Sequence, residues 1–169
     1  LKNRKVAVKE FFLKEHCERD ASTSYISMGT SGSKDLVLKF KNKFIKEAET
    51  IAEMDNPHIV RIHDVFEENG TAYYVMEYLS CGSLSDRIPS GGLPESEAVG
   101  YIRQVADALS YIHENKILHL DIKPSNIILN SKGRIKLIDF DSSRLFKEES
   151  SGDTRLLGTE RYAPPEQYG

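Results

Sequence analysis

The chain has 169 residues, with 23 Lys and Arg against 26 Asp and Glu, so its formal net charge is −3. A length in this range corresponds to one domain or two small lobes. Hydrophobic residues make up 39% of the chain and charged residues 29%, which is typical of a globular protein and excludes a disordered one. No apolar run approaches the length of a membrane-spanning helix, and the slightly acidic balance offers no footprint for nucleic acid. We therefore expect no nucleic-acid partner and no membrane contact in this segment.

Two features favour a cytoplasmic piece of a longer protein. Cys17 and Cys81 lie far apart, cannot form a disulfide framework or a zinc knuckle, and fit a reducing compartment. The chain also begins at Leu1, without an initiator Met or a signal peptide.

The first predicted element is a short strand at residues 4–9, where Val residues alternate with other side chains. Residues 10–33 have no regular pattern and are rich in Lys, Glu, Ser, Thr and Gly, so we expect a long loop there. We expect the Phe pair at 11–12 to pack this loop onto the first lobe. The His-Cys pair at 16–17 is expected at the surface, because one His and one Cys are too few ligands for a metal.

A helix and a hairpin follow. The helix is predicted from about residue 33 to Met54, where Asn-Pro at 56–57 ends it. Two apolar, β-branched and aromatic runs at 59–66 and 71–77 are joined by an Asn-Gly pair, which is typical of a β-hairpin.

The second half predicts more helix than strand. One helical turn is expected between the loops within residues 81–92, and a long helix over about 94–115. A second hairpin is predicted from runs at 126–129 and 134–138, and residues 139–169 read as mostly polar loop. The apolar stripe of the long helix is predicted to contain Ala98, Ile102, Val105, Leu109 and Ile112.

Lys9 and Glu47 are the first pair with chemical interest. On the first long helix, Phe44, Ala48 and Ile51 form an apolar stripe, and Glu47 falls inside it. A carboxylate on a buried face is costly unless a cation pairs with it, so we predict a Lys9–Glu47 ion pair. Such a pair holds an ammonium group in place for an anionic ligand, although Lys9 alone also fits an ordinary sheet-edge lysine.

A second group of polar residues flanks the predicted hairpin of residues 126–138. Asp121 and Asn126 come just before its apolar part, and Asp139 comes just after it. Mg²⁺ prefers oxygen ligands and accompanies phosphates. These three groups together with the Lys–Glu pair therefore predict a site for phosphoryl transfer.

The combined motifs resemble those of protein kinases over essentially the whole chain. The segments that carry the resemblance are Val-Ala-Val-Lys at 6–9, His-Leu-Asp-Ile-Lys-Pro-Ser-Asn at 119–126 and Ile-Asp-Phe-Asp at 138–141. The resemblance implies an α+β, protein-kinase-like two-lobe fold that is truncated at both ends. Residues 1–79 would form a partial N-lobe and residues 80–169 a partial C-lobe.

The resemblance also assigns roles in ATP- and Mg²⁺-dependent chemistry. It implies that Asp121 is the catalytic base, that Lys123 steadies the γ-phosphate, and that Thr159 hydrogen-bonds the catalytic Asp. Asn126 and Asp139 would hold Mg²⁺. The residues implied to bind the nucleotide, in the strand, the helix, the gatekeeper-hinge stretch and the adenine pocket, are Lys9, Glu47, Ala7, Met76, Glu77, Leu79 and Ile128.

Two details indicate the kind of kinase. Asp-Ile-Lys at 121–123, with Lys two residues after Asp, is the form found in Ser/Thr kinases. Residues 160–167, with Ala-Pro-Pro-Glu at their centre, are similar to eukaryotic-like Ser/Thr kinases of bacteria. The resemblance thus implies a bacterial-type enzyme that phosphorylates protein Ser or Thr hydroxyls.

Several positions depart from the family pattern. No Gly-x-Gly-x-x-Gly precedes Lys9, and no late C-lobe helix follows Gly169, so we expect the isolated fragment to be poorly stable and weak or inactive. Leu120 stands where most regulated kinases carry an Arg that binds an activation-loop phosphate, and Asp141 replaces the usual Gly after Asp-Phe. Because Leu120 stands in place of that Arg, we expect that activation-loop phosphorylation is not the main on-switch. The hydroxyls that lose this receiver are Ser142, Ser143, Ser150, Ser151 and Thr154.

Two other functions remain open at this point. A small-molecule phosphotransferase of the aminoglycoside-kinase type shares a similar pattern, and Asp141 favours it, whereas Lys123 and the segment from Thr159 onward favour a protein kinase. A pseudokinase that acts as a binding scaffold is the third reading. It requires that the glycine-rich loop be absent from the gene.

Overall fold

The computed structural model describes residues 4–29, 31–145 and 159–167. The chain divides into two compact units, which are described separately below. The first contains Leu1–Met54 and Arg61–Tyr78, and the second contains Asp55–Val60 and Leu79–Gly169. Both helices and strands are present, which confirms the α+β class. In the part of the chain that the structure describes, no helix combines the length and the apolar character needed to cross a membrane.

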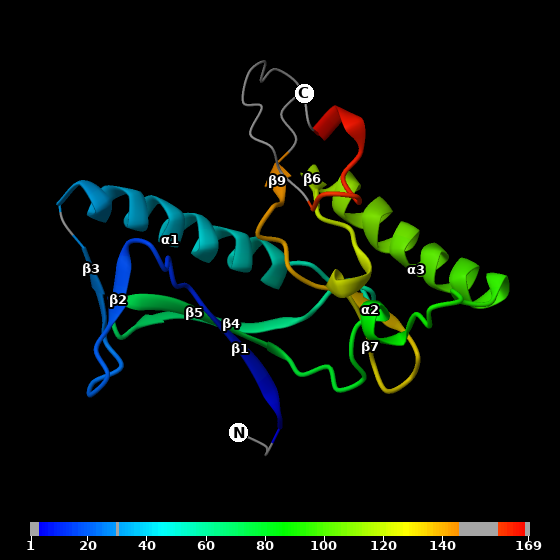
Figure 1. The fold of residues 1–169 in the computed structure, drawn as a ribbon, viewed down its shortest axis with the longest axis horizontal. Helices are drawn as coiled ribbons and strands as arrows, with labels where there is room; N and C mark the ends of the chain where they lie inside the picture. Colours follow the sequence, from blue (N-terminus) through cyan, green and yellow to red (C-terminus); the bar gives the residue numbers. More distant parts are fainter. Residues whose placement is uncertain (1–3, 30, 146–158, 168–169) are drawn as a thin grey trace. The chain divides into compact units, whose positions relative to one another are not determined.

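The first unit is built on a three-stranded antiparallel sheet in the order β1-β5-β4 (Figure 1). Its strands are β1 (Val6–Glu10), β4 (Ile62–Glu68) and β5 (Thr71–Glu77). The predicted hairpin is confirmed, and its turn residues Asn69 and Gly70 both have positive φ, as a tight hairpin turn requires. β4 begins later than predicted because Ile59 belongs to the second unit, where it forms a β-bridge with Leu137.

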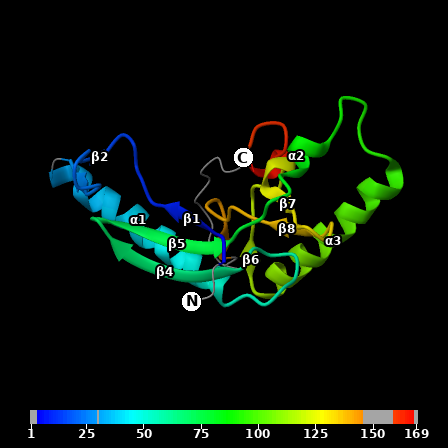
Figure 2. The same ribbon diagram turned by 90° about the horizontal axis from the view of Figure 1, so that it is seen from below.

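Helix α1 (Ser31–Ala52) lies along this sheet (Figure 2). Its predicted apolar stripe is confirmed, since Phe44, Ala48 and Ile51 are all buried. The Phe44 ring stacks on Tyr74 of β5 with 5.1 Å between ring centroids. At the far edge of the sheet, Lys41 forms an ion pair with Glu67 at 2.6 Å.

A hairpin occupies the segment that the sequence predicted to be loop. Its strands are β2 (Cys17–Arg19) and β3 (Ile26–Met28). Cys17 and Ile26 are buried with Val37 of α1, so the expectation of a surface position for Cys17 was wrong. Strands of three residues are too short to show a period-2 pattern, and this hairpin is stabilised by contacts with distant residues. Phe11 packs against the same cluster, whereas Phe12 is exposed.

The turn between β4 and β5 packs directly against the β2–β3 hairpin. The backbone N–H of Ile26 donates to the carbonyl oxygen of Asn69 at 2.8 Å. A Cβ atom at Gly70 would lie 2.3 Å from the carbonyl oxygen of Ile26. A side chain at position 70 would therefore clash with the hairpin.

Among its described residues, the second unit contains two α-helices and two small two-stranded ribbons. The long helix predicted around 94–115 is α3 (Glu95–Glu114), and the predicted helical turn is α2 (Leu84–Arg87). The predicted second hairpin is formed by β7 (Ile127–Leu129) and β8 (Ile135–Leu137). β7 contacts α2 and β8 contacts α3. The elements that the sequence did not predict are β6 (Ile117–Leu118), which pairs with β9 (Arg144–Leu145), and the 3-10 turns η1 (Pro124–Asn126) and η2 (Pro165–Gln167).

One member of the predicted stripe on α3 is misplaced. Val105, Ala108 and Ile112 are buried, but Ile102 is 64% exposed. At 100° per residue, Ile102 lies about 90° from the centre of the buried face, so it falls at the edge of the stripe.

We predict that Ile26→Ala lowers the free energy of unfolding by about 2–5 kcal/mol, because it opens a cavity where the β2–β3 hairpin meets α1. Urea unfolding of the full-length protein measures this change. Ser27→Ala is the matched control, since Ser27 is the next residue of the same strand and is exposed. Equal stabilities of the two variants would contradict the buried position of Ile26.

Candidate active site

His119 fixes the backbone of the loop between β6 and β7. Its ring is buried and lies 4.6 Å from the ring of Phe140, measured between centroids. The backbone N–H of Asp121 donates to Nδ1 of His119 at 3.3 Å, so Nδ1 carries no proton. Nε2 then donates to the carbonyl oxygen of Ile138 at 3.1 Å. Burial lowers the pKa of His119, which agrees with this neutral form.

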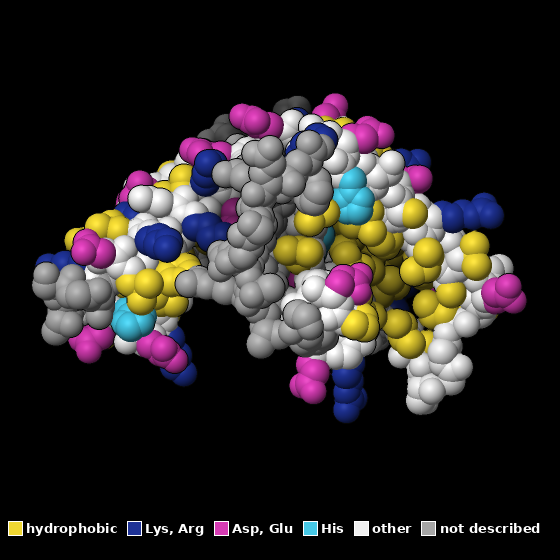
Figure 3. Space-filling model, turned by 90° about the horizontal axis from the view of Figure 1, so that it is seen from above, with side chains coloured by type: hydrophobic (Ala, Val, Ile, Leu, Met, Phe, Trp, Pro, Cys, Tyr) yellow, Lys and Arg dark blue, Asp and Glu magenta, His cyan; other side chains and the backbone are white. Residues whose placement is uncertain are grey.

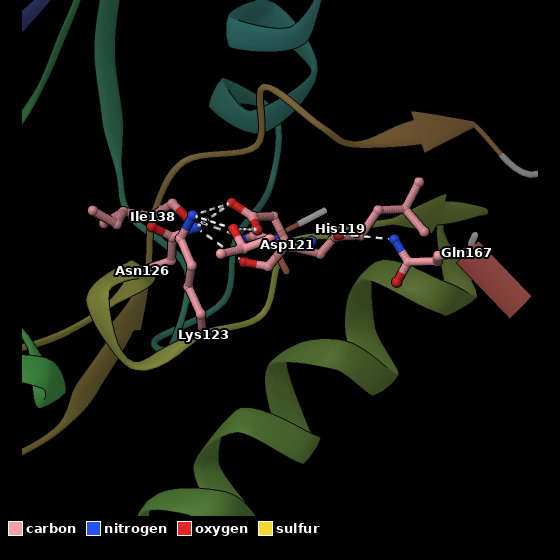
Figure 4. A network of polar contacts seen from close by, with 8 residues as sticks. His119, Asp121, Lys123, Asn126, Ile138 and Gln167 are labelled. Carbon is pink, nitrogen blue, oxygen red and sulfur yellow. Dashed lines mark hydrogen bonds and ion pairs between the residues drawn. The ribbon is translucent and has the colours of Figure 1, made fainter. Parts of the chain in front are cut away.

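The carboxylate of Asp121 is the centre of a polar network (Figure 4). Lys123 Nζ lies 2.7 Å from Oδ2. The hydroxyl of Thr159 donates to Oδ1 at 2.6 Å, and Nδ2 of Asn126 donates to Oδ2 at 2.9 Å. Asp121 is 9% exposed, so these donors take the place of water around a carboxylate that solvent hardly reaches.

The network keeps Asp121 ionised. Burial by itself raises the pKa of this carboxyl group. The hydrogen bonds from Lys123 and Thr159, the positive charge of Lys123 and the hydrogen bond from Asn126 outweigh burial, and the pKa falls below its ordinary value of 3.8. Asp121 is therefore a carboxylate at neutral pH, which is the form that accepts a proton.

Lys123 and Thr159 also contact each other. Lys123 Nζ donates to the Thr159 hydroxyl oxygen at 2.7 Å, while the same hydroxyl donates to Asp121. The structure thus brings together the three residues to which the sequence resemblance assigned catalytic roles.

Asn126 and Asp139, the two predicted metal ligands, come close through the backbone. The backbone N–H of Ile138, the residue before Asp139, donates to the carbonyl oxygen of Asn126 at 3.0 Å. The side-chain Nδ2 of Asn126 donates to both the carbonyl oxygen and the carboxylate of Asp121, each at 2.9 Å. With Nδ2 engaged in these two bonds, Oδ1 is the atom of the amide group that can act as a metal ligand. An amide oxygen and a neighbouring carboxylate are the donor types that fit Mg²⁺.

The first unit carries the predicted phosphate-pairing residues. Lys9 pairs in register with Tyr74 on β5, and its Nζ lies 5.8 Å from the centroid of the Tyr74 ring. Glu47 Oε1 lies 3.1 Å from Nζ of Lys43, one turn earlier on α1. The Lys9–Glu47 ion pair stays a prediction.

The residues predicted around adenine are divided between the units. In the first unit, Ala7 lies opposite Met76 in the β1–β5 register, and a carboxylate oxygen of Glu77 accepts from the backbone N–H of Arg61 at 2.9 Å. In the second unit, Leu79 and Ile128 are both half-buried, and Ile128 forms a β-bridge with Ser83. Their contact with adenine stays a prediction.

The structure also shows where some of the residues that depart from the kinase pattern, and the hydroxyl residues near them, are located. Asp141 is exposed, directly after the buried Phe140. Ser142 and Ser143 are half-buried. Ser150, Ser151 and Thr154 lie outside the described residues.

Gln167 is a contact of the site that sequence reasoning missed. Its Nε2 donates to the carbonyl oxygen of Leu120 at 3.0 Å, across 47 residues of sequence. No local pattern signals a contact of this kind. Gln167, Thr159 and Asp121 all line a groove of about 370 Å³, whose apolar wall includes Leu109 and Pro164. Figure 3 shows hydrophobic side chains gathered around a hollow on this face of the second unit.

Comparisons with known proteins point in one direction. A family model described as "Protein kinase domain" matches residues 2–168. Mitogen-activated protein kinase kinase 9 of Arabidopsis thaliana is 33% identical over 152 residues, which cover 89% of this chain and 48% of that protein. Serine/threonine-protein kinase PrkC of Bacillus subtilis (strain 168) is 36% identical over 131 residues, which cover 76% of this chain and 20% of that protein.

The solved structure "PpkA-294 apo form" resembles the chain with a TM-score of 0.73 at 25% sequence identity, over 81% of this chain and 49% of that one. The chain spans about half the length, or less, of the curated relatives named above. The family match over nearly the whole chain, together with the likeness in structure, shows that the chain has the protein kinase fold and belongs to the protein kinase family.

Proposed function

We propose that the full-length protein transfers the γ-phosphate of ATP to Ser or Thr hydroxyls of a protein substrate. The observation that carries this proposal is the buried, ionised carboxylate of Asp121 in contact with Lys123 and Thr159. The printed name of the relative PrkC, a serine/threonine-protein kinase, supports the choice of Ser and Thr.

Asp121 acts as the base in this proposal. The hydroxyl proton of the substrate passes to a carboxylate oxygen of Asp121 as the hydroxyl oxygen attacks the γ-phosphorus. The bond between the γ-phosphorus and the bridging oxygen breaks in the same transfer, and ADP leaves with that pair of electrons. The lowered pKa keeps the carboxylate free of protons before this step. Lys123, already bound to the carboxylate, supplies positive charge next to the point where the phosphoryl group moves.

The proposal includes Mg²⁺ and ATP as cofactors. Asn126 and Asp139 would hold the metal ion, which when bound neutralises negative charge on the phosphates. Lys9, kept in place by Glu47, would bind the phosphates of ATP. The residues proposed to contact adenine are Ala7, Met76, Glu77, Leu79 and Ile128.

The substrate class and location extend the proposal. Thr159 and Gln167 contact the catalytic loop, which supports a role of their segment beside a peptide substrate and so favours a protein substrate over an aminoglycoside-type one. The likeness of residues 160–167 to bacterial Ser/Thr kinases supports a bacterial-type enzyme, and the two cysteines, neither of which is in a disulfide, support a cytoplasmic location.

We predict that Asp121→Asn lowers kcat by about 10²–10⁴-fold, because the amide keeps the size of the side chain but cannot accept the proton. The affinity for ATP with Mg²⁺ should stay within about threefold, because the base is needed for the transfer step. Radiolabel transfer from ATP to a generic Ser/Thr protein substrate and calorimetric titration of the full-length protein measure the two effects.

Lys132→Ala, at an exposed turn, is the control and should leave both values unchanged. Unchanged kcat in Asp121→Asn would contradict the role of Asp121. A wild-type protein that binds ATP with Mg²⁺ but transfers no phosphate would instead indicate a pseudokinase scaffold. Transfer to an aminoglycoside and not to protein would indicate the small-molecule enzyme.

Thr159 provides a second prediction. Thr159→Val removes the hydroxyl that donates to Asp121 and accepts from Lys123, while keeping the shape of the side chain. Hydrogen bonds to charged groups contribute about 1.5–3 kcal/mol, so kcat should fall about 10- to 100-fold. Thr159→Ser keeps the hydroxyl and should retain kcat within about threefold. Equal kcat values for the Val and Ser variants, measured in the same transfer assay, would show that the hydroxyl has no such role.

A further inference from the structure

The backbone immediately before the proposed base has an unusual conformation. Leu120 has φ of 62°, in the left-handed region that a Leu residue rarely adopts. Its carbonyl oxygen accepts a hydrogen bond from Nε2 of Gln167 at 3.0 Å. Figure 4 shows this bond at one end of the network around Asp121.

The peptide group between Leu120 and Asp121 is held from both sides. Its carbonyl oxygen is bound by Gln167, and its N–H donates to Nδ1 of His119 at 3.3 Å. The atoms of a peptide group lie in one plane, with C=O and N–H pointing in opposite directions. Two bonds at these opposite ends fix the orientation of the plane, and that orientation sets the position of the Asp121 Cα atom.

The segment that contains Gln167 also holds the side chain of Asp121. Thr159 donates to its carboxylate, and the backbone N–H groups of Tyr162 and Ala163 both donate to the Thr159 carbonyl oxygen at 3.0 Å. The backbone N–H of Gln167 donates to the carbonyl oxygen of Pro164 at 3.0 Å. The segment is therefore folded on itself, and it reaches Asp121 through two separate bonds, one to the side chain and one to the preceding carbonyl.

We propose that Gln167 is a positioning residue for phosphoryl transfer, which fixes the Leu120–Asp121 peptide plane and so couples residues 159–167 to the base. The expected change in kcat rests on the proposed function. The expected fixing of the Leu120–Asp121 peptide plane does not. The side chain of Leu120 is apolar and cannot bind a phosphate group. The connection between position 120 and residues 159–167 is instead the neutral hydrogen bond from Gln167 to the Leu120 carbonyl oxygen.

The test replaces Gln167 by Met, which has a similar length but no donor. In the full-length protein, Gln167→Met should lower kcat about tenfold and leave KM for ATP within about twofold, because the bond orients the base and contacts no nucleotide. Amide hydrogen exchange at Asp121 should become about tenfold faster. Exchange at Ile138, whose N–H is bonded to Asn126, should not change.

A matched control is available in α3. Gln104 also bonds the backbone with its side chain, accepting from the N–H of Ile135 at 3.1 Å and donating to the carbonyl oxygen of Gly100 at 3.2 Å. Gln104→Met should lower stability while leaving kcat and exchange at Asp121 unchanged. If Gln167→Met behaves in the same way, its role is structural and the proposal is overturned.

A second variant tests the backbone conformation itself. Asn adopts the left-handed region more readily than Leu, so Leu120→Asn reduces the need for a bond that holds it there. In this background, Gln167→Met should lower kcat by less than about threefold, and an undiminished tenfold loss would contradict the mechanism. If the wild-type protein transfers no phosphate and Gln167→Met still makes exchange at Asp121 faster, the proposed function is refuted, whereas the claim that Gln167 holds the Leu120–Asp121 peptide plane is supported.

Discussion

The candidate active site depends on keeping the Asp121 carboxylate ionised where water hardly reaches it. Burial by itself raises the pKa of this carboxyl group and so favours its protonated form. Lys123, Thr159 and Asn126 reverse this preference by donating to its two oxygens. The same contacts fix the direction of the carboxylate, so one set of bonds sets both its charge and its orientation.

The surrounding fold explains why these donors are in place. Lys123 and Asn126 come from the same loop as Asp121, and η1 turns that loop so that Asn126 reaches back to it. Thr159 comes from a segment far along the chain, as does Gln167. His119 joins the loop to Ile138, just before Asp139. The proposed base is thus linked by hydrogen bonds to Asn126, to Ile138 just before Asp139, and to residues 159–167.

Sequence reasoning was most successful where the signal was local or where several motifs combined. The periodicity of α1 and α3, the Asn-Gly turn and the closeness of Asp121 to Asn126, which are joined by hydrogen bonds, all lie within short windows. It failed where distant contacts decide the structure. The β2–β3 hairpin is held by Val37 and by the carbonyl of Asn69, which no pattern in its three-residue strands reveals. Gln167 has no motif of its own, and its role emerges only when its segment meets Leu120.

The ionisation of Asp121 is tested most directly by its own titration. Carbon-13 NMR of the labelled carboxyl group in the full-length protein, assigned by comparison with Asp121→Asn, follows that titration as the pH is lowered. The donor network predicts a carboxylate throughout the neutral range and a protonation midpoint below the ordinary value of 3.8. Because the pKa of Asp121 is lowered in the folded protein, the donor network stabilises the folded state when the carboxyl group is ionised. This stabilisation is lost as the pH falls through the midpoint. A midpoint above 3.8 would show that burial prevails over the donors and would contradict the claim that this network stabilises the ionised form.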